Sequence, residues 1–200
     1  MKHLITLFVL LLISTSVKSQ EMNIETKSVS IEQLITFIIE HIEAKEEGSE
    51  FPIQNITFLV QVQPNDLALE DKVILKQAFK LISNRLTNDD TISLIAYSGM
   101  NGVALKQTSP KQIKGILFAI ENLKSSIKEF HSDGIALAYD YAKENFSEES
   151  INTVIMIRTS NNNNEEHTAN QATVTTKKKN NAVLITAIAL LPEIISVIKN

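Results

Sequence analysis

The amino-acid sequence predicts a three-layer α/β/α sandwich with a mostly parallel central sheet and one antiparallel edge strand. From residue 56 onward, short apolar runs alternate with segments of helical periodicity, which indicates a parallel sheet covered on both faces. The 200 residues, of which 44% are hydrophobic, suffice for one buried core. Gly99 and Gly102 flank a tight turn, and this predicts a hairpin that places the antiparallel strand at a sheet edge.

The individual elements follow from local patterns. Strands are expected at residues 56–62, 91–97, 103–105, 153–157 and 182–190. Helices are expected at residues 70–86, from Pro110 as the first helical residue to about residue 123, at residues 133–146, and from Pro192 onward. Residues 161–181 are polar, with four consecutive asparagines, and are expected to hold only a weak helix. Residues 51–200 are therefore expected to form one domain.

The first 19 residues have the features of a secretory signal peptide. Lys2 precedes an apolar run from Leu4 to Ile13, small and polar residues follow, and cleavage is expected before Gln20. The alternative, an amino-terminal membrane anchor, is disfavoured because about 20 apolar residues are needed to span a bilayer. The absence of cysteine excludes a disulfide framework and lipid attachment at a new amino-terminal cysteine. We expect an exported protein, periplasmic or secreted, with no stable membrane span after cleavage.

The charge balance argues against nucleic acid as a partner. Without residues 1–19 the chain carries 17 basic and 23 acidic residues, a net charge of −6. Binding to a phosphate backbone requires an excess of basic side chains. The basic cluster at residues 177–179 lies in a polar stretch and is typical of a solvated loop or helix end.

Residues 20–50 form a separate predicted segment ahead of the alternating pattern. Residues 20–29 are polar and are expected to be disordered or loosely attached. Ser30 and Gln33 have the spacing of a capping box, and apolar residues at helical spacing predict an amphipathic helix that ends near Gly48. The apolar stripe consists of Ile31, Leu34, Ile35, Ile38, Ile39 and Ile42. The helix either packs on the domain that follows or serves a partner, and the periodicity fits both.

The order of elements and three segments resemble the von Willebrand factor A domain, most closely its bacterial YfbK-like branch. Residues 91–99, TISLIAYSG, resemble a strand of that family, and residues 154–157 stand where the family has the strand before its "TDG" motif. Residues 134–139 and 142–146 resemble a helix of the YfbK-like branch. The resemblance covers about residues 53–200 and implies the three-layer fold already expected from the alternating pattern.

The resemblance also implies a metal-ion-dependent adhesion site at the carboxyl ends of the strands, but other residues occupy every ligand position. In the family, D-x-S-x-S, a later Thr and the Asp of "TDG" hold Mg²⁺ through hard oxygen ligands. Here these positions carry Gln61, Gln63, Asn65, Glu129 and Ser160. Glu129 follows from an ungapped alignment, and a shift of one loop would instead offer Ser132 or Asp133. Because neutral oxygens replace two carboxylates, we expect a degenerate site without metal.

The sequence contains no local motif of a catalytic site or of another metal site. None of the histidines has a second His or Cys at metal-ligand spacing, and neither a nucleophile elbow nor a phosphate-binding loop occurs. The adjacent residues His131, Ser132 and Asp133 cannot form a hydrolase triad through proximity in sequence alone. We therefore expect a protein that is not an enzyme and uses no cofactor.

These inferences lead to one functional expectation and two alternatives. We expect an exported protein-binding module that contacts another protein through the loops around residues 61–69, 129–134 and 159–166. The candidate contact residues are Gln61, Gln63, Asn65, Glu129 and Ser160, with Asn161 beside them. In one alternative these residues only fill the vacated site and the binding face lies elsewhere. In the other, an altered cation site of Glu129, Asp133 and Asp66 binds a ligand through a metal.

Overall fold

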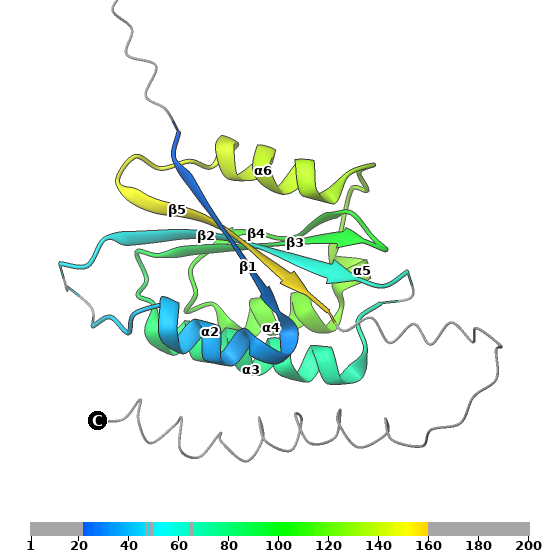
Figure 1. Cartoon of the computed structure of the whole chain (residues 1–200), viewed down its shortest axis with the longest axis horizontal. Coiled ribbons are helices and arrows are strands. Elements are labelled where there is room, and N and C mark those ends of the chain that lie inside the picture. The colour runs from blue at the N-terminus through cyan, green and yellow to red at the C-terminus, as the bar shows by residue number, and fades with distance from the viewer. Residues whose placement is uncertain (1–21, 47, 49, 65, 160–200) are drawn as a thin grey trace, which may run out of the picture.

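The computed structural model describes residues 22–46, 48, 50–64 and 66–159 and confirms the predicted fold class. A five-stranded sheet with the strand order β1-β5-β2-β3-β4 forms the middle layer (Figure 1). The β1–β5, β5–β2 and β2–β3 pairs are parallel, and the edge strand β4 runs antiparallel to β3. The predicted signal peptide, the polar stretch at residues 161–181, the predicted strand at residues 182–190 and the helix from Pro192 lie outside the described residues.

The elements lie close to the predicted positions within residues 53–158. The strands are β1 (Ile24–Ser30), β2 (Ile53–Val62), β3 (Thr91–Ser98), β4 (Gly102–Thr108) and β5 (Ser150–Arg158). The helices are the 3-10 turn η1 (Ile31–Gln33), α2 (Leu34–His41), α3 (Leu69–Arg85), α4 (Ile113–Glu121), α5 (Leu123–Ser126) and α6 (Gly134–Glu144). Pro110 is not the first helical residue, because the N-cap of α4 is Gln112.

Helices cover both faces of the sheet and enclose two apolar cores. The helices α2, α3 and α4 lie on one face and α6 on the other (Figure 1). Alternate residues of β2 serve the two sides, since Phe58 belongs to the larger core and Leu59 to the smaller core beneath α6. In the larger core the rings of Phe58 and Phe79 meet edge to face, with centroids 4.8 Å apart.

The expectation that residues 20–29 are disordered or loosely attached is wrong for the part that the structure describes. Residues 24–30 form β1, and each of its seven residues is in register with a residue of β5. The sequence pattern does not predict this strand, because an edge strand buries few side chains and only Val29 of β1 is buried. Backbone pairing with β5 holds the strand in the sheet, and this pairing does not require apolar and polar residues to alternate in the sequence.

The amphipathic helix is shorter than predicted and packs on its own domain. It ends at His41 rather than near Gly48, and the capping box is not formed, because Ser30 makes no side-chain bond to a backbone amide. The side chain of Arg85 at the end of α3 donates to the carbonyl oxygens of Ile42 (2.6 Å) and Ile39 (3.1 Å). These bonds satisfy carbonyl groups that a helix end leaves without partners.

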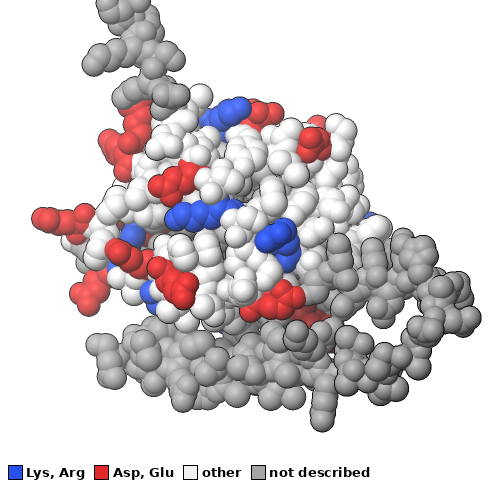
Figure 2. All heavy atoms as spheres, in the orientation of Figure 1, with Lys and Arg blue, Asp and Glu red and all other residues white. Residues whose placement is uncertain are grey.

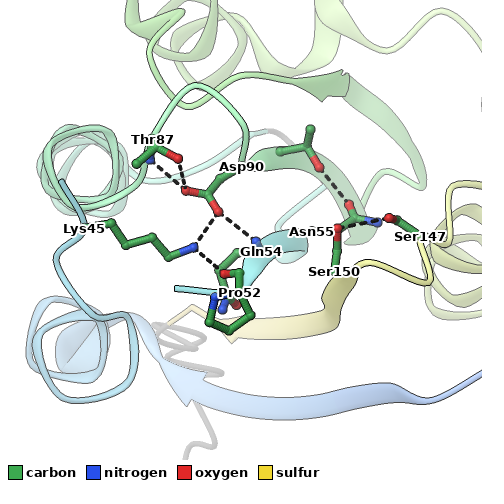
Figure 3. Close-up of polar contacts among 9 residues, drawn as sticks. Lys45, Pro52, Gln54, Asn55, Thr87, Asp90, Ser147 and Ser150 are labelled. Carbon is green, nitrogen blue, oxygen red and sulfur yellow. Dashed lines mark hydrogen bonds and ion pairs between the residues drawn. The ribbon is translucent and has the colours of Figure 1, made fainter. Parts of the chain in front are cut away.

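Asp90 joins three chain segments at the amino ends of the strands (Figure 3). Its carboxylate accepts hydrogen bonds from the Lys45 ammonium, the Gln54 amide and the Thr87 amide, each at 2.7 Å. The Lys45 and Asp90 side chains are 5% and 0% exposed. Burial alone would raise the pKa of Asp90, but the hydrogen bonds from Lys45, Thr87 and Gln54 outweigh burial and lower it.

A second buried polar cluster links four strands near the same end of the sheet. The amide of Asn55 donates to the side-chain oxygen of Asn152 at 2.9 Å, and its oxygen accepts from Thr91 at 3.0 Å and from Gln107 at 3.2 Å. The amide of Asn152 in turn donates to backbone carbonyls of Ser147 and Ser150. Because these buried groups are paired, the desolvation of the amides is compensated.

We expect Lys45→Met to destabilise the fold by about 3–5 kcal/mol, because the substitution leaves the Asp90 carboxylate buried without its counter-ion. Urea unfolding at pH 7 measures the loss. Lys143→Met is the matched control, because Lys143 is 53% exposed and its ion pair with Asp140 is long, at 3.7 Å, so its removal should cost less than about 1 kcal/mol. Equal effects of the two substitutions would contradict the role assigned to the buried pair.

The pKa of Asp71 is shifted in the opposite direction from that of Asp90, so the two residues change the stability of the fold with pH in opposite directions. It lies in the first turn of α3 and is 6% exposed, and burial, with the nearby carboxylates of Glu32 and Glu70, raises its pKa from 3.8 to about 6. A raised pKa means that the folded state favours the protonated carboxyl. The stability contributed by Asp71 is therefore complete below pH 3.8 and is lost as the pH rises through about 6.

Asp71→Asn should accordingly stabilise the protein at pH 7.5, by roughly 1 kcal/mol after allowance for solvent screening. The gain should disappear below pH 3.8, where the carboxyl is protonated in both the folded and the unfolded state. Urea unfolding at pH 7.5 and pH 3.5 checks both values. A loss of stability at pH 7.5 would show that the ionised carboxylate has a stabilising partner.

Candidate binding surface

The carboxyl ends of β5, β2 and β3 meet at one edge of the sheet, which we call the carboxyl edge. It comprises these strand ends and the connections at residues 63–68, 99–101 and 127–133. The chain passes from β2 to β3 and β4 and then returns to β5 on the other side of β2. Open α/β sheets bind ligands where the strand order reverses in this way, outside the carboxyl ends of the strands.

Close backbone contact holds the first two connections together. The amide of Gly99 donates to the carbonyl of Val62 at 2.7 Å. A Cβ atom on Gly99 would lie 2.3 Å from the carbonyl carbon of Gln63 and 2.4 Å from the nitrogen of Pro64. Only glycine fits between the two segments, so the β3–β4 turn lies directly against the connection that follows β2.

Asn101 fastens the third connection to the same turn. Its side-chain oxygen accepts from the Ser98 amide and its side-chain amide donates to the Ser132 carbonyl, both at 3.0 Å. Its backbone carbonyl accepts from the His131 amide at 2.9 Å. Next to this connection α6 begins at Gly134, where a Cβ atom would lie 2.7 Å from the Cβ of Tyr97. The three connections therefore form one tied unit.

The structure brings the described candidate residues to this edge. Gln61 lies at the end of β2 opposite Tyr97 of β3, and Gln63 follows two residues later in a bridge with Asp66. Both glutamines are half-buried, whereas Glu129 is exposed in the connection between α5 and α6. Asn65, Ser160 and Asn161 are candidate residues that lie outside the described part of the chain.

Two of the three carboxylates of the alternative cation site, Asp66 and Asp133, are engaged elsewhere. Asp66 pairs with the Lys72 ammonium at 2.7 Å and accepts from the Leu67 amide. Asp133 caps α6 by accepting from the amides of Ile135 and Ala136 at 2.8 and 3.1 Å. Within the described residues, no group of three His, Cys, Asp or Glu side chains is placed to hold a metal ion. The geometry does not favour a site built from Asp66, Glu129 and Asp133.

Two residues that the sequence did not single out lie beside Gln61. Val60 pairs with Ile157 and Gln61 with Tyr97, so the next residue of β5, Arg158, falls alongside Gln61. Burial raises the pKa of Tyr97, and the positive charge of Arg158 acts in the opposite direction. The sequence held one signal, because Arg158 ends a strand whose preceding residues are largely apolar.

Large apolar side chains are exposed around the same edge. Leu69, at the start of α3, is 77% exposed, the highest value for a large apolar side chain among the described residues. Phe130 is 60% exposed in the α5–α6 connection, and Ile135 is 40% exposed in the first turn of α6. Exposed aromatic and aliphatic side chains on well-held connections are typical of protein–protein contact surfaces.

The opposite, amino end of the sheet differs from the carboxyl edge in its charge. On the face shown in Figure 2, most acidic side chains gather over the side where the strands begin, and fewer lie over the side where they end. A hollow of about 270 Å³ lies there between the starts of β1 and β5, and Glu25, Glu148 and Asn152 are among its lining residues. The Asn152 side chain is already hydrogen-bonded.

No family model, no curated protein and no solved structure matches this chain.

We expect Gly99→Ala to destabilise the protein by about 1–3 kcal/mol, because the added methyl group must displace the backbone at Gln63 and Pro64. Gly115→Ala is the matched control. Gly115 lies within α4 and a Cβ atom there meets nothing within 4 Å, so alanine should stabilise by about 0.5–1 kcal/mol. Urea unfolding compares the two variants, and a Gly99→Ala protein as stable as wild type would contradict the close contact.

Proposed function

We propose that this chain is an exported, non-enzymatic protein-binding module that contacts another protein through its carboxyl edge. The observation that carries the proposal is the exposure of Phe130 on the α5–α6 connection and of Leu69 at the first residue of α3, beside connections that hydrogen bonds and close backbone contacts hold in place. Large apolar side chains exposed at fixed positions gain free energy when a partner covers them.

The rigidity of the edge supports this proposal. Binding costs free energy when loops must be ordered, and connections that are already tied down avoid that cost. Asn101 holds the connection that carries Phe130, and the cap formed by Asp133 fixes the start of α6 beside it. The surface is thus formed before a partner arrives.

The resemblance to the von Willebrand factor A domain supports the same face. The three-layer fold with a mostly parallel sheet is the fold that the resemblance implies, and Gln61 and Gln63 lie at the strand end where it places metal ligands. We propose that contacts of these residues with the partner are direct hydrogen bonds from their amides, with no shared metal ion. We propose no catalytic step here.

Export through the signal peptide at residues 1–19 is part of the proposal and concerns residues outside the described range. Among the described residues, no helix combines the length and apolar character that a bilayer crossing requires. Because export is part of the proposal, the proposed partner lies outside the cytoplasm.

Phe130→Ser should weaken capture of the partner by about 30-fold, the effect expected when one buried aromatic contact is lost from an interface. Phe118→Ser is the matched control, because Phe118 is 63% exposed but lies on α4, away from the carboxyl edge. The measurement is titration of the full chain against a partner captured by cross-linking from the extracellular fraction. If only Phe118→Ser weakens binding, the contact surface lies on the helical face instead.

The thermal midpoint of the full chain should be the same in EDTA and in millimolar Mg²⁺, Mn²⁺ or Ca²⁺, because Gln61 and Ser160 put neutral oxygens where the resemblance places the two carboxylate ligands. A metal that binds only the folded state at 100 times its dissociation constant adds about 2.7 kcal/mol and would raise the midpoint by several degrees. A saturable rise would contradict the metal-free proposal.

A further inference from the structure

Three polar side chains form a row across the ends of three adjacent strands. We call Arg158, Gln61 and Tyr97 the polar row. They occupy neighbouring positions on β5, β2 and β3, one step beyond the paired residues Ile157 and Val60. All three point to the α6 side of the sheet, because Met156 and Leu59, two residues earlier on β5 and β2, and Tyr97 itself pack with the smaller core.

The polar row has unused hydrogen-bonding capacity. Arg158 is exposed, and Gln61 and Tyr97 are half-buried. Within the described residues, no hydrogen bond or ion pair engages the side chains of these three residues. Arg85, the other arginine of the sequence, instead donates to two helix-end carbonyls. Arg158 is therefore not used by the fold in the way that Arg85 is.

Apolar side chains flank the row at its Tyr97 end. Gly134, the first residue of α6, lies against Tyr97, and the next residue along the chain is the exposed Ile135. The connection that leads into α6 carries the exposed Phe130 and is fastened to the β3–β4 turn. A surface that crosses the strand ends thus changes from cationic at Arg158 to apolar at α6.

The chemistry of this surface selects the charge of its partner. A guanidinium offers paired donors that match a carboxylate in a bidentate arrangement, and the glutamine amide and tyrosine hydroxyl can bond to backbone groups beside it. The protein as a whole is acidic, and on the face in Figure 2 the acidic side chains gather mostly at the other end of the strands. At the carboxyl edge Asp66 is paired with Lys72, Asp133 caps α6 and Glu129 lies beside Gly102 of β4, so the Arg158 end of the row is the part of this edge that attracts an acidic segment.

We propose that the partner is a protein segment that presents an Asp or Glu side chain to Arg158 and a large apolar side chain to Phe130 and Ile135. This inference rests on the proposed function and specifies the partner of that same surface. Neighbouring strands are about 4.8 Å apart, so the row spans roughly 10 Å, and an extended chain rises about 3.3 Å per residue. Because Ile135 follows Gly134, which lies against Tyr97 at the end of the row, the acidic and apolar residues of the partner are separated by about three to four positions.

The two parts of the surface have different roles. An exposed ion pair by itself adds little affinity, whereas buried aromatic contacts supply most of it. Arg158 therefore sets which segments bind, and Phe130 sets how tightly they bind. We expect Arg158→Gln to reduce the affinity for an acidic segment by about three- to fivefold and to leave the affinity for the neutral version of that segment unchanged.

The test is selection of a random peptide library, displayed on phage, against the immobilised full chain. The wild-type protein should enrich peptides with Asp or Glu three to four positions from a large apolar residue. Arg158→Glu should enrich Lys or Arg at the acidic position instead. Lys106→Glu is the matched control, because Lys106 is exposed on β4 and its charge reversal should leave the wild-type preference in place.

The outcomes separate this inference from the function on which it rests. Peptides that bind wild type, fail to bind Phe130→Ser and show no acidic preference would overturn the inference and leave the binding surface standing. If no selected peptide depends on Phe130, both fail. A charge preference that Lys106→Glu reverses as strongly as Arg158→Glu would also overturn the assignment to Arg158. If Arg158→Glu has a lowered urea midpoint, Arg158→Gln replaces it, with loss of the acidic preference as the expected result.

Discussion

The buried ion pair between Lys45 and Asp90 is the interaction on which the amino-terminal part of this fold depends. The Asp90 carboxylate receives donors from the segment after α2, from the start of β2 and from the loop before β3. A charge with no exposure to solvent is tolerated only where such donors surround it. The pair holds the α2–β2 connection, and next to it the bonds from Arg85 join the end of α2 to α3.

The two ends of the sheet use their polar groups differently. At the amino ends, Asp90, Asn55 and Asn152 are buried and bonded within the protein, so their hydrogen-bonding capacity supports stability. At the carboxyl edge the backbone is held as firmly, through Gly99 and Asn101, but the side chains it carries face outward. A rigid backbone with available side chains is the arrangement that binding requires, because little order remains to be gained on contact.

Hydrophobic periodicity explains why most of the fold was predictable. The strand β2 and the helix α3 are long and bury most of one or both faces, so their side chains follow the period of their secondary structure. The strand β1 gave no such signal, because one edge-strand position is buried and the rest are polar or partly exposed. The predicted end of α2, near Gly48, was wrong because the observed end depends on a distant residue. Its last carbonyls accept hydrogen bonds from Arg85, which lies 43 residues away from Ile42 in sequence.

The sequence by itself determined the layer architecture and the antiparallel hairpin, because each of these depends on local pattern or residue identity. Only the tertiary structure decided that β1 joins the sheet, that α2 packs on its own domain, and that Arg158, Gln61 and Tyr97 lie side by side. These three depend on strand register and on contacts between residues distant in sequence. Register is set by the packing of the whole sheet, so no local window of residues contains it.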